Sequence, residues 1–227
     1  MTSSPKRLID VLRDPGELWR LLREYFDFKR LRRLEPVRNR DSLKEFLNTR
    51  ASFVAQTSLY GYLRTRAGMR YPELFDDDVF VTSINIAKWQ MWLACLSDIS
   101  VFAGGLILKR SNANEEQVSA LMNKIVDEIL IGTGNPEEAG EKFAEKANHV
   151  RQRIAICRWN EVTDDELPFS HSPPALVEWA PIVDELKQMD EEIVINSVRF
   201  RWQKVRQDLR NTLDADEIIN NTGYPDE

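Results

Sequence analysis

The longest apolar run in the chain covers residues 79–108, VFVTSINIAKWQMWLACLSDISVFAGGLIL. Three aspartates immediately precede the run, and Lys109 and Arg110 follow it, which is the order of charge that complements a helix dipole. The run is apolar on most of its circumference, as is typical of a helix surrounded by protein or by lipid. We therefore predict one helix of roughly 45 Å, since each residue adds about 1.5 Å, with the rest of the chain packed around it.

Lipid is the first alternative for this helix, because a membrane-spanning helix needs about 20 predominantly apolar residues. The most apolar window of that length, residues 89–108, has Asp98 near its middle. An aspartate at the centre of a bilayer costs about 2.5 to 3.5 kcal/mol, so the sequence favours the buried helix of a soluble bundle. In that setting Asp98 needs a hydrogen-bond or cationic partner. It is also a candidate for a functional acid.

Small or neutral polar residues recur every seven positions along the same run, at Ser83, Gln90, Ser97 and Gly104. Positions seven apart fall on one side of an α-helix. We predict that a neighbouring helix approaches closely along this side.

Caps and apolar stripes predict further helices on both sides of the central one. Breaks fall at residues 67–78, where Gly68 and Pro72 oppose helix continuation, at 132–136 and in the proline-rich segment 163–174. No segment alternates with a period of two residues, so no strand is predicted. The predicted fold class is all-α, an irregular helical bundle around one long buried central helix. The other predicted helices cover residues 5–13, 17–34, 41–66, 115–131, 136–159, 175–188 and 190–213.

Composition divides the chain into three segments. Residues 1–40 contain basic amphipathic helices, residues 41–160 the central helical core, and residues 161–227 a C-terminal helical hairpin packed on the core, with an acidic tail that we expect to fray after Ala215. The last long helix has apolar side chains at spacings of three and four residues, which indicates one buried face: Val194, Val198, Trp202, Val205, Leu209 and Leu213.

The net charge of -6 hides an uneven distribution. Residues 1–70 contain 16 Lys and Arg against 8 Asp and Glu, whereas the rest of the chain contains 15 against 29. Near the start, Trp19 and Phe26 lead into Arg30, Arg32 and Arg33, a composition that suits an anionic membrane surface. The same segment could instead pack its apolar side into the core and its arginines against the acidic remainder of the fold. Both outcomes stay open from the sequence.

The chain has two cysteines, Cys95 and Cys157, and neither has CxxC or zinc-ligand spacing. We expect reduced cysteines in a cytoplasmic protein, and a single disulfide between them stays open. The first ten residues, MTSSPKRLID, lack the apolar region of a secretory signal. The predicted location is the cytoplasm, with the inner face of the membrane as a peripheral site.

Motifs of enzyme chemistry are missing from the sequence. There is no G-x-S-x-G elbow and no H-E-x-x-H zinc motif, and Glu145 precedes His149 by four residues where a di-iron motif needs three. No metal or cofactor is therefore predicted. The alternative of a hydrolase or small-molecule-binding protein would need a pocket, for which the candidate residues are Tyr60, Arg64, Asp98 and His171.

Residues 60–71 combine tyrosines with arginines, a composition that can stack bases and neutralise phosphates. No helix-turn-helix, zinc-finger or RNA-recognition signature accompanies it, and the chain as a whole is acidic. Nucleic acid is therefore a disfavoured partner, kept as a third reading in which the protein binds an anionic polymer weakly.

Two stretches carry a resemblance to a known family: RASFVAQTSLYGYLRTRAGMRYPELFDDDVF and WAPIVDELKQMDEEIVINSVRFRWQKVRQDLR. They resemble an uncharacterised family of small helical proteobacterial proteins, some of which are labelled "esterase". The label implies a hydrolase, but this chain lacks the residues that hydrolase chemistry requires. The function predicted from the residues is a non-enzymatic helical adaptor or assembly factor that binds another protein, with the cytoplasmic membrane surface as a further site of action. The sequence leaves the oligomeric state open.

Overall fold

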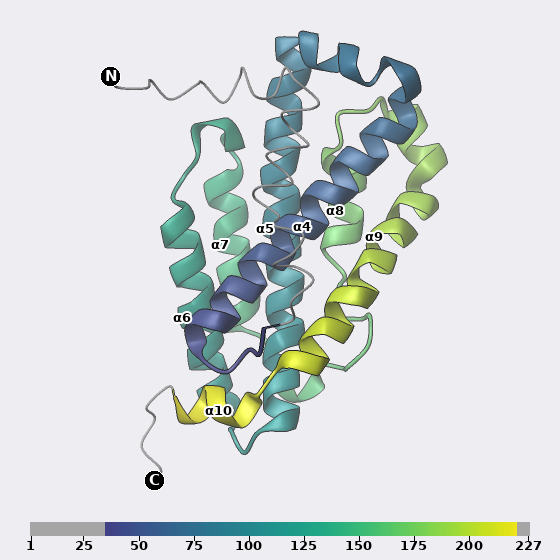
Figure 1. Ribbon diagram of the computed structural model, residues 1–227. Helices are drawn as coiled ribbons and strands as arrows, with labels where there is room; N and C mark the ends of the chain where they lie inside the picture. Colours follow the sequence, from purple (N-terminus) through teal and green to yellow (C-terminus); the bar gives the residue numbers. More distant parts are fainter. Residues whose placement is uncertain (1–34, 222–227) are drawn as a thin grey trace, which may run out of the picture.

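The computed structural model describes residues 35–221 and is all-helical over that range, which confirms the predicted fold class. Four short 3-10 turns interrupt the connections: η1 (Gly68–Arg70), η2 (Pro72–Asp76), η3 (Glu137–Ala139) and η4 (Trp159–Glu161). The α-helices drawn in Figure 1 are α4 (Arg40–Ala67), α5 (Asp78–Arg110), α6 (Glu115–Thr133), α7 (Phe143–Ala155), α8 (Ser172–Trp179), α9 (Asp184–Thr212) and α10 (Ala215–Asn220).

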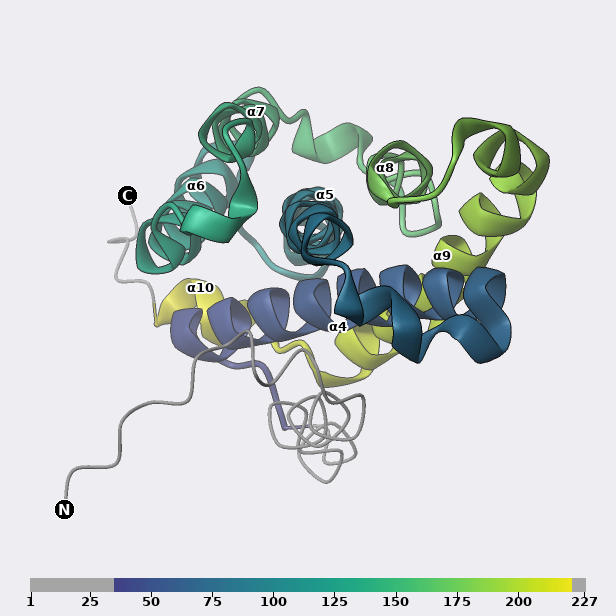
Figure 2. The same cartoon turned by 90° about the horizontal axis from the view of Figure 1, so that it is seen from above.

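Helix α5 lies at the centre of the bundle. Seen along its axis in Figure 2, it is enclosed by α4, by the pair α6 and α7, and by α8, with α9 outside α8 and α4. Asp77 begins the helix, because its carboxylate accepts hydrogen bonds from the backbone N–H groups of Val79 (2.9 Å) and Phe80 (3.3 Å). The helix is long and apolar enough to cross a membrane, but 89% of its apolar window is buried inside the protein. The protein's own helices therefore shield it, as predicted.

The two long helices α4 and α9 lie along one side of α5 (Figure 1). The buried side of α4 includes the small residues Ala51, Ala55 and Ser58, which lets it approach α5 closely. A main-chain hydrogen bond joins the segment just before α4 to the end of α9, since the N–H of Val37 donates to the carbonyl of Thr212 at 2.8 Å. The predicted buried stripe of α9 is confirmed from Val194 to Leu209, and Leu213 is half-buried.

Three sequence-based boundaries are wrong. A continuous helix over residues 136–159 does not form, because Gly140 has φ 77° and separates η3 from α7; this left-handed conformation interrupts a helix. The break before the last long helix lies at residues 180–183 and not at 189, because Ala180 is extended (ψ 131°) and a proline follows it. The expected fraying after residue 215 is wrong for α10, since Asp214 caps this helix by accepting from Glu217 N; residues 222–227 lie outside the described residues.

The small residues of α5 do allow a close approach, although the neighbour at Gly104 is not a helix. A Cβ atom added to Gly104 would lie 2.2 Å from Cζ3 of Trp159, and one added to Gly105 would lie 2.3 Å from Cγ1 of Val162. Trp159 belongs to η4, so a 3-10 turn lies directly on the α5 backbone. The segment between α7 and α8 therefore packs against α5 at this point.

Candidate functional site

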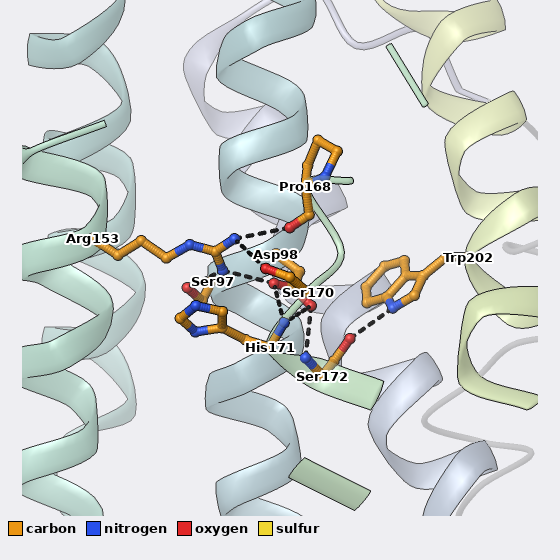
Figure 3. Close-up of polar contacts among 8 residues, drawn as sticks. All are labelled: Ser97, Asp98, Arg153, Pro168, Ser170, His171, Ser172 and Trp202. Carbon is orange, nitrogen blue, oxygen red and sulfur yellow. Dashed lines mark hydrogen bonds and ion pairs between the residues drawn. The ribbon is translucent and has the colours of Figure 1, made fainter. Parts of the chain in front are cut away.

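Asp98 is fully buried in the middle of α5, with 0% of its surface exposed. Its carboxylate accepts hydrogen bonds from three directions, as Figure 3 shows. Nη1 of Arg153 in α7 donates at 2.7 Å, the backbone N–H of Ser172 donates at 2.7 Å, and that of His171 donates at 3.1 and 3.2 Å to the two oxygens. The last two donors belong to the start of α8, where the helix dipole favours a negative charge.

Arg153 extends this centre from α7 into the loop before α8. Its Nη1 also donates to Oγ of Ser97 at 2.9 Å, and its Nη2 donates to the carbonyl of Pro168 at 2.9 Å and to Oγ of Ser170 at 3.4 Å. The guanidinium therefore connects α5, α7 and the loop at once (Figure 3). The partner that a buried aspartate requires is present.

Ser172 carries the same network on to α9. Its hydroxyl accepts a hydrogen bond from Nε1 of Trp202 at 2.8 Å, and both side chains are buried. The ring of Trp202 lies 4.6 Å from that of Phe169, centroid to centroid. Four elements, α5, α7, α8 and α9, are thus held at one place in the core.

The arrangement around Asp98 is suited to positioning and not to proton transfer. Its carboxylate has no exposed surface, so a substrate cannot reach it. The nearby thiol offers no nucleophile, because burial raises the pKa of Cys95 well above its ordinary value and the charge of Asp98 raises it further. Cys157 is half-buried, and burial raises its pKa to about 11. Both cysteines are free, which removes the disulfide alternative.

A hollow of about 310 Å³ opens between α5, α7 and α8, next to this centre. Ser97, Ser170 and His171 belong to both the hollow and the surroundings of Asp98. The two histidines of the chain, His149 and His171, both line it. The remaining lining side chains are Gln90, Leu93, Ala94, Lys146, Val150, Pro174, Ala175, Glu178 and Trp179.

Its surroundings keep the imidazole of His171 neutral near pH 7. The pKa of His171 is lowered from its ordinary value, first by burial and then by the positive charges of Arg153 and Lys146, while the charge of Asp98 acts in the opposite direction. A neutral imidazole has one donor and one acceptor nitrogen. The hollow can therefore offer either kind of hydrogen bond at this point.

The structure brings together two of the four residues that the sequence suggested for a pocket. Asp98 and His171 are in direct contact, but Tyr60 and Arg64 lie on α4, where both interact electrostatically with Tyr71. Burial raises the pKa of Tyr60, so its hydroxyl stays protonated. Among the residues that line the hollow, sequence reasoning missed Lys146 and Trp179, for which no local signal exists. Gln90 and Ser97 had been singled out because they are seven residues apart on one side of the central helix.

Within residues 35–221, no group of three or more His, Cys, Asp and Glu side chains lies close enough together to hold a metal ion. The residues predicted to meet an anionic or membrane surface, Trp19, Phe26, Arg30, Arg32 and Arg33, lie outside the described residues. Their role stays a prediction.

Helix α9 has a second candidate surface on the side that faces away from the core. Met189, Ile193 and Phe200 are 75%, 72% and 70% exposed. Successive residues advance by about 100°, so these three fall within about 40° of one another on the helix; we call them the α9 stripe. Large exposed apolar groups that gather in one place are typical of protein-interaction sites. Their signal in the sequence was hidden by the stronger buried stripe of the same helix.

Comparison of the chain with protein-family models, curated proteins and solved structures found no significant match. The resemblance to the esterase-labelled family therefore stays a prediction, and the function has to be argued from the residues themselves.

Proposed function

We propose that this protein is a helical adaptor or assembly factor that binds another protein through the α9 stripe. The observation that carries the proposal is the exposure of Met189, Ile193 and Phe200 on one side of a helix whose opposite side is buried. Covering such side chains removes apolar surface from water, at about 25 cal/mol per Å². The helix supports that contact, because its buried residues run from Val194 to Leu209 and Asp190 near its start accepts hydrogen bonds from Tyr62 and Arg66 of α4.

The charges along one border of the stripe indicate the chemistry of the partner. Glu185, Glu192 and Arg199 are all exposed and follow one another at intervals of seven residues, so they form one row beside the stripe. A partner helix with an apolar stripe would complement this row if it placed cations opposite the two glutamates and an acid opposite Arg199. Such complementary rows select a partner and set its register.

The test separates the partner helix from two other occupants of the stripe. One is the amphipathic segment 17–34 of the same chain, since the chain enters the described fold at Val37 beside the end of α9. The other is a second copy of the protein. We favour a helix of another protein, because the order acid, acid, base along the row can be matched by opposite charges on a specific partner.

The test uses the full chain and two fluorescent helical peptides of about four heptads that share one leucine stripe. The matched peptide has lysines opposite Glu185 and Glu192 and a glutamate opposite Arg199, and the swapped peptide has the reverse charges. Fluorescence anisotropy should show the matched peptide binding about tenfold tighter or more, a difference of roughly 1.4 kcal/mol. Substitution of Met189, Ile193 and Phe200 together by glutamine should abolish binding.

The control variant is Ile131→Gln with Ile156→Gln, because these side chains are 73% and 79% exposed, in α6 and just after the end of α7. It should bind like the wild type. Equal affinity for the two peptides, or undiminished binding by the triple variant, overturns the proposal. If the double variant Leu21→Glu with Leu22→Glu binds the matched peptide more tightly than the wild type does, the occupant of the stripe is segment 17–34. If the triple variant is a monomer in sedimentation and the wild type is a dimer, the occupant is a second copy of the protein.

The membrane part of the predicted function is a separate proposal and rests on the sequence of residues 17–34 alone. Six cations against one acid within residues 29–40 would each contribute about 1 kcal/mol near anionic lipid. Flotation with vesicles of phosphatidylserine and phosphatidylcholine should recover the wild type and not Arg30/Arg32/Arg33→Glu. Absence of the wild type from the floated fraction removes this part.

A further inference from the structure

Gln90 is a buried amide with an unfilled hydrogen-bond position. Its side chain is 3% exposed, it lines the hollow between α5, α7 and α8, and its Nε2 has no hydrogen-bond partner among residues 35–221. A buried donor without a partner costs about 1 to 3 kcal/mol. An acceptor that reaches Nε2 from the hollow, after a small shift of the side chain, would recover that free energy.

The wall beside it adds a positive charge. Lys146 of α7 lines the hollow, and its ammonium group lies 6.0 Å from the ring centroid of Trp179 on the opposite wall. Arg153 at the inner end is already engaged with Asp98 and the loop. Glu178 is a rim residue of opposite sign, but its side chain is exposed, so water and salt weaken its effect.

Apolar side chains make up about half of the lining, and its remaining polar residues are Ser97, Ser170 and the two histidines. Leu93, Val150 and Ala175 are buried, and Trp179 is half-buried. A ligand that matches this hollow therefore needs a compact apolar body and one acceptor group with negative charge. Apolar side chains combined with convergent polar groups are typical of small-molecule sites.

We propose that the hollow binds a small organic carboxylate. The carboxylate accepts a hydrogen bond from Nε2 of Gln90 and pairs with the ammonium of Lys146, and the apolar body lies against Leu93, Val150 and Trp179. Hydrogen bonds between charged groups are about twice as strong as those between neutral ones, so the charge of the ligand contributes to affinity and not only to orientation. The site lies between α5, α7 and α8, away from the α9 stripe, and the two proposals stand or fall independently.

The two histidines make occupancy directly measurable in the full chain. Because both line the hollow, the imidazole region of a ¹H–¹⁵N or ¹H–¹³C spectrum contains only signals from this site. Titration with benzoate and with isovalerate, as an aromatic and an aliphatic probe, should shift at least one imidazole signal saturably. Benzamide and isovaleramide have the same apolar bodies without the negative charge. Their affinity should be lower than that of the carboxylates by about tenfold or more.

Single substitutions locate the carboxylate. Lys146→Met keeps most of the side-chain volume but removes the charge, and Gln90→Met removes the amide; each should weaken benzoate binding about tenfold. Glu178→Gln should tighten it, because it removes the acid at the rim. The matched control is Lys142→Met, since Lys142 also lies over Trp179, at 5.6 Å, without lining the hollow.

Circular dichroism checks that each variant is folded. If Gln90→Met does not fold, the comparison of Lys146→Met with the wild type still tests whether the hollow binds a carboxylate. The proposal is overturned if neither carboxylate produces a saturable shift, if the amides bind as tightly as the carboxylates, or if Lys146→Met and Lys142→Met behave alike.

Discussion

Nη1 of Arg153 lies 2.7 Å from Oδ1 of Asp98, and this ion pair joins α7 to the middle of the central helix. The carboxylate is fully buried, and the arginine side chain is 19% exposed. Pairs of this kind are costly to assemble, but they are more costly to break, because the remaining charge is left without a partner.

Arg153→Met should therefore lower the free energy of unfolding by about 3 to 5 kcal/mol. The matched control is Arg151→Met, two residues earlier on the same helix, since Arg151 pairs at 2.7 Å with the exposed Asp127 and surface pairs contribute about 0 to 1 kcal/mol. Urea unfolding followed by circular dichroism measures both. Equal losses in the two variants would show that burial of Asp98 does not govern the pair.

The hydrogen bond from Trp202 to Ser172 predicts a coupling between α8 and α9. Ser172→Ala and Trp202→Phe should each destabilise the protein, and the double variant should be more stable than the sum of the two losses implies, by about 0.5 to 1.5 kcal/mol, because the bond can be lost only once. Unfolding of the four proteins in urea gives this coupling energy. A value of zero would mean that the two groups pack together without an effective bond.

Gly104 predicts a steric effect at the contact with Trp159. Gly104→Ala should destabilise the protein by about 1 to 3 kcal/mol, because the indole ring has to move and overpacking strains a core. Gly132→Ala in α6 is the control of opposite sign: nothing lies within 4 Å of its Cβ position, and alanine stabilises a helix by about 0.5 to 1 kcal/mol relative to glycine. Thermal unfolding of both variants checks the signs, and a neutral Gly104→Ala would contradict the close approach.

The sequence predicted those elements whose signals are local. Helix α5 was placed within two residues at each end, because Asp77 and the cations after residue 108 mark its ends directly. Asn114 and Gln117 likewise form the capping box that begins α6. Where a boundary depends on a backbone conformation, as at Gly140, composition alone was not enough, since a glycine inside a helical pattern is compatible with both outcomes.

The site was less predictable, because it is made by helix crossings. Asp98 was identified as an acid in need of a partner, but Arg153 is 55 residues away in the chain, and no periodicity relates the two. Tyr60 and Arg64 were grouped with Asp98 by residue type only, and α4 places them beside Tyr71. The amide nitrogen of Gln90, which has no hydrogen-bond partner among residues 35–221, could not be predicted, because its burial depends on how the neighbouring helices pack around it.

The environment of His171 predicts a pH dependence with a definite sign. Burial, Arg153 and Lys146 lower the pKa of this imidazole below its ordinary value of 6.5, against the opposing effect of Asp98. The unfolded chain therefore binds a proton at higher pH than the folded protein does. Stability should be fully present above pH 6.5 and should decrease as the pH falls from there through the folded pKa.

Imidazole NMR of the full chain measures the folded pKa, and His171→Gln assigns the signal. Lys146→Met should raise the pKa of His171, because it removes one of the positive charges that oppose protonation, whereas Lys142→Met should leave it unchanged. The contribution of His171 to the loss of stability between pH 7.5 and 5.5 should be absent in His171→Gln. A folded pKa above 6.5 would reverse the expected slope and show that Asp98, and not burial and the two cations, dominates the field at this imidazole.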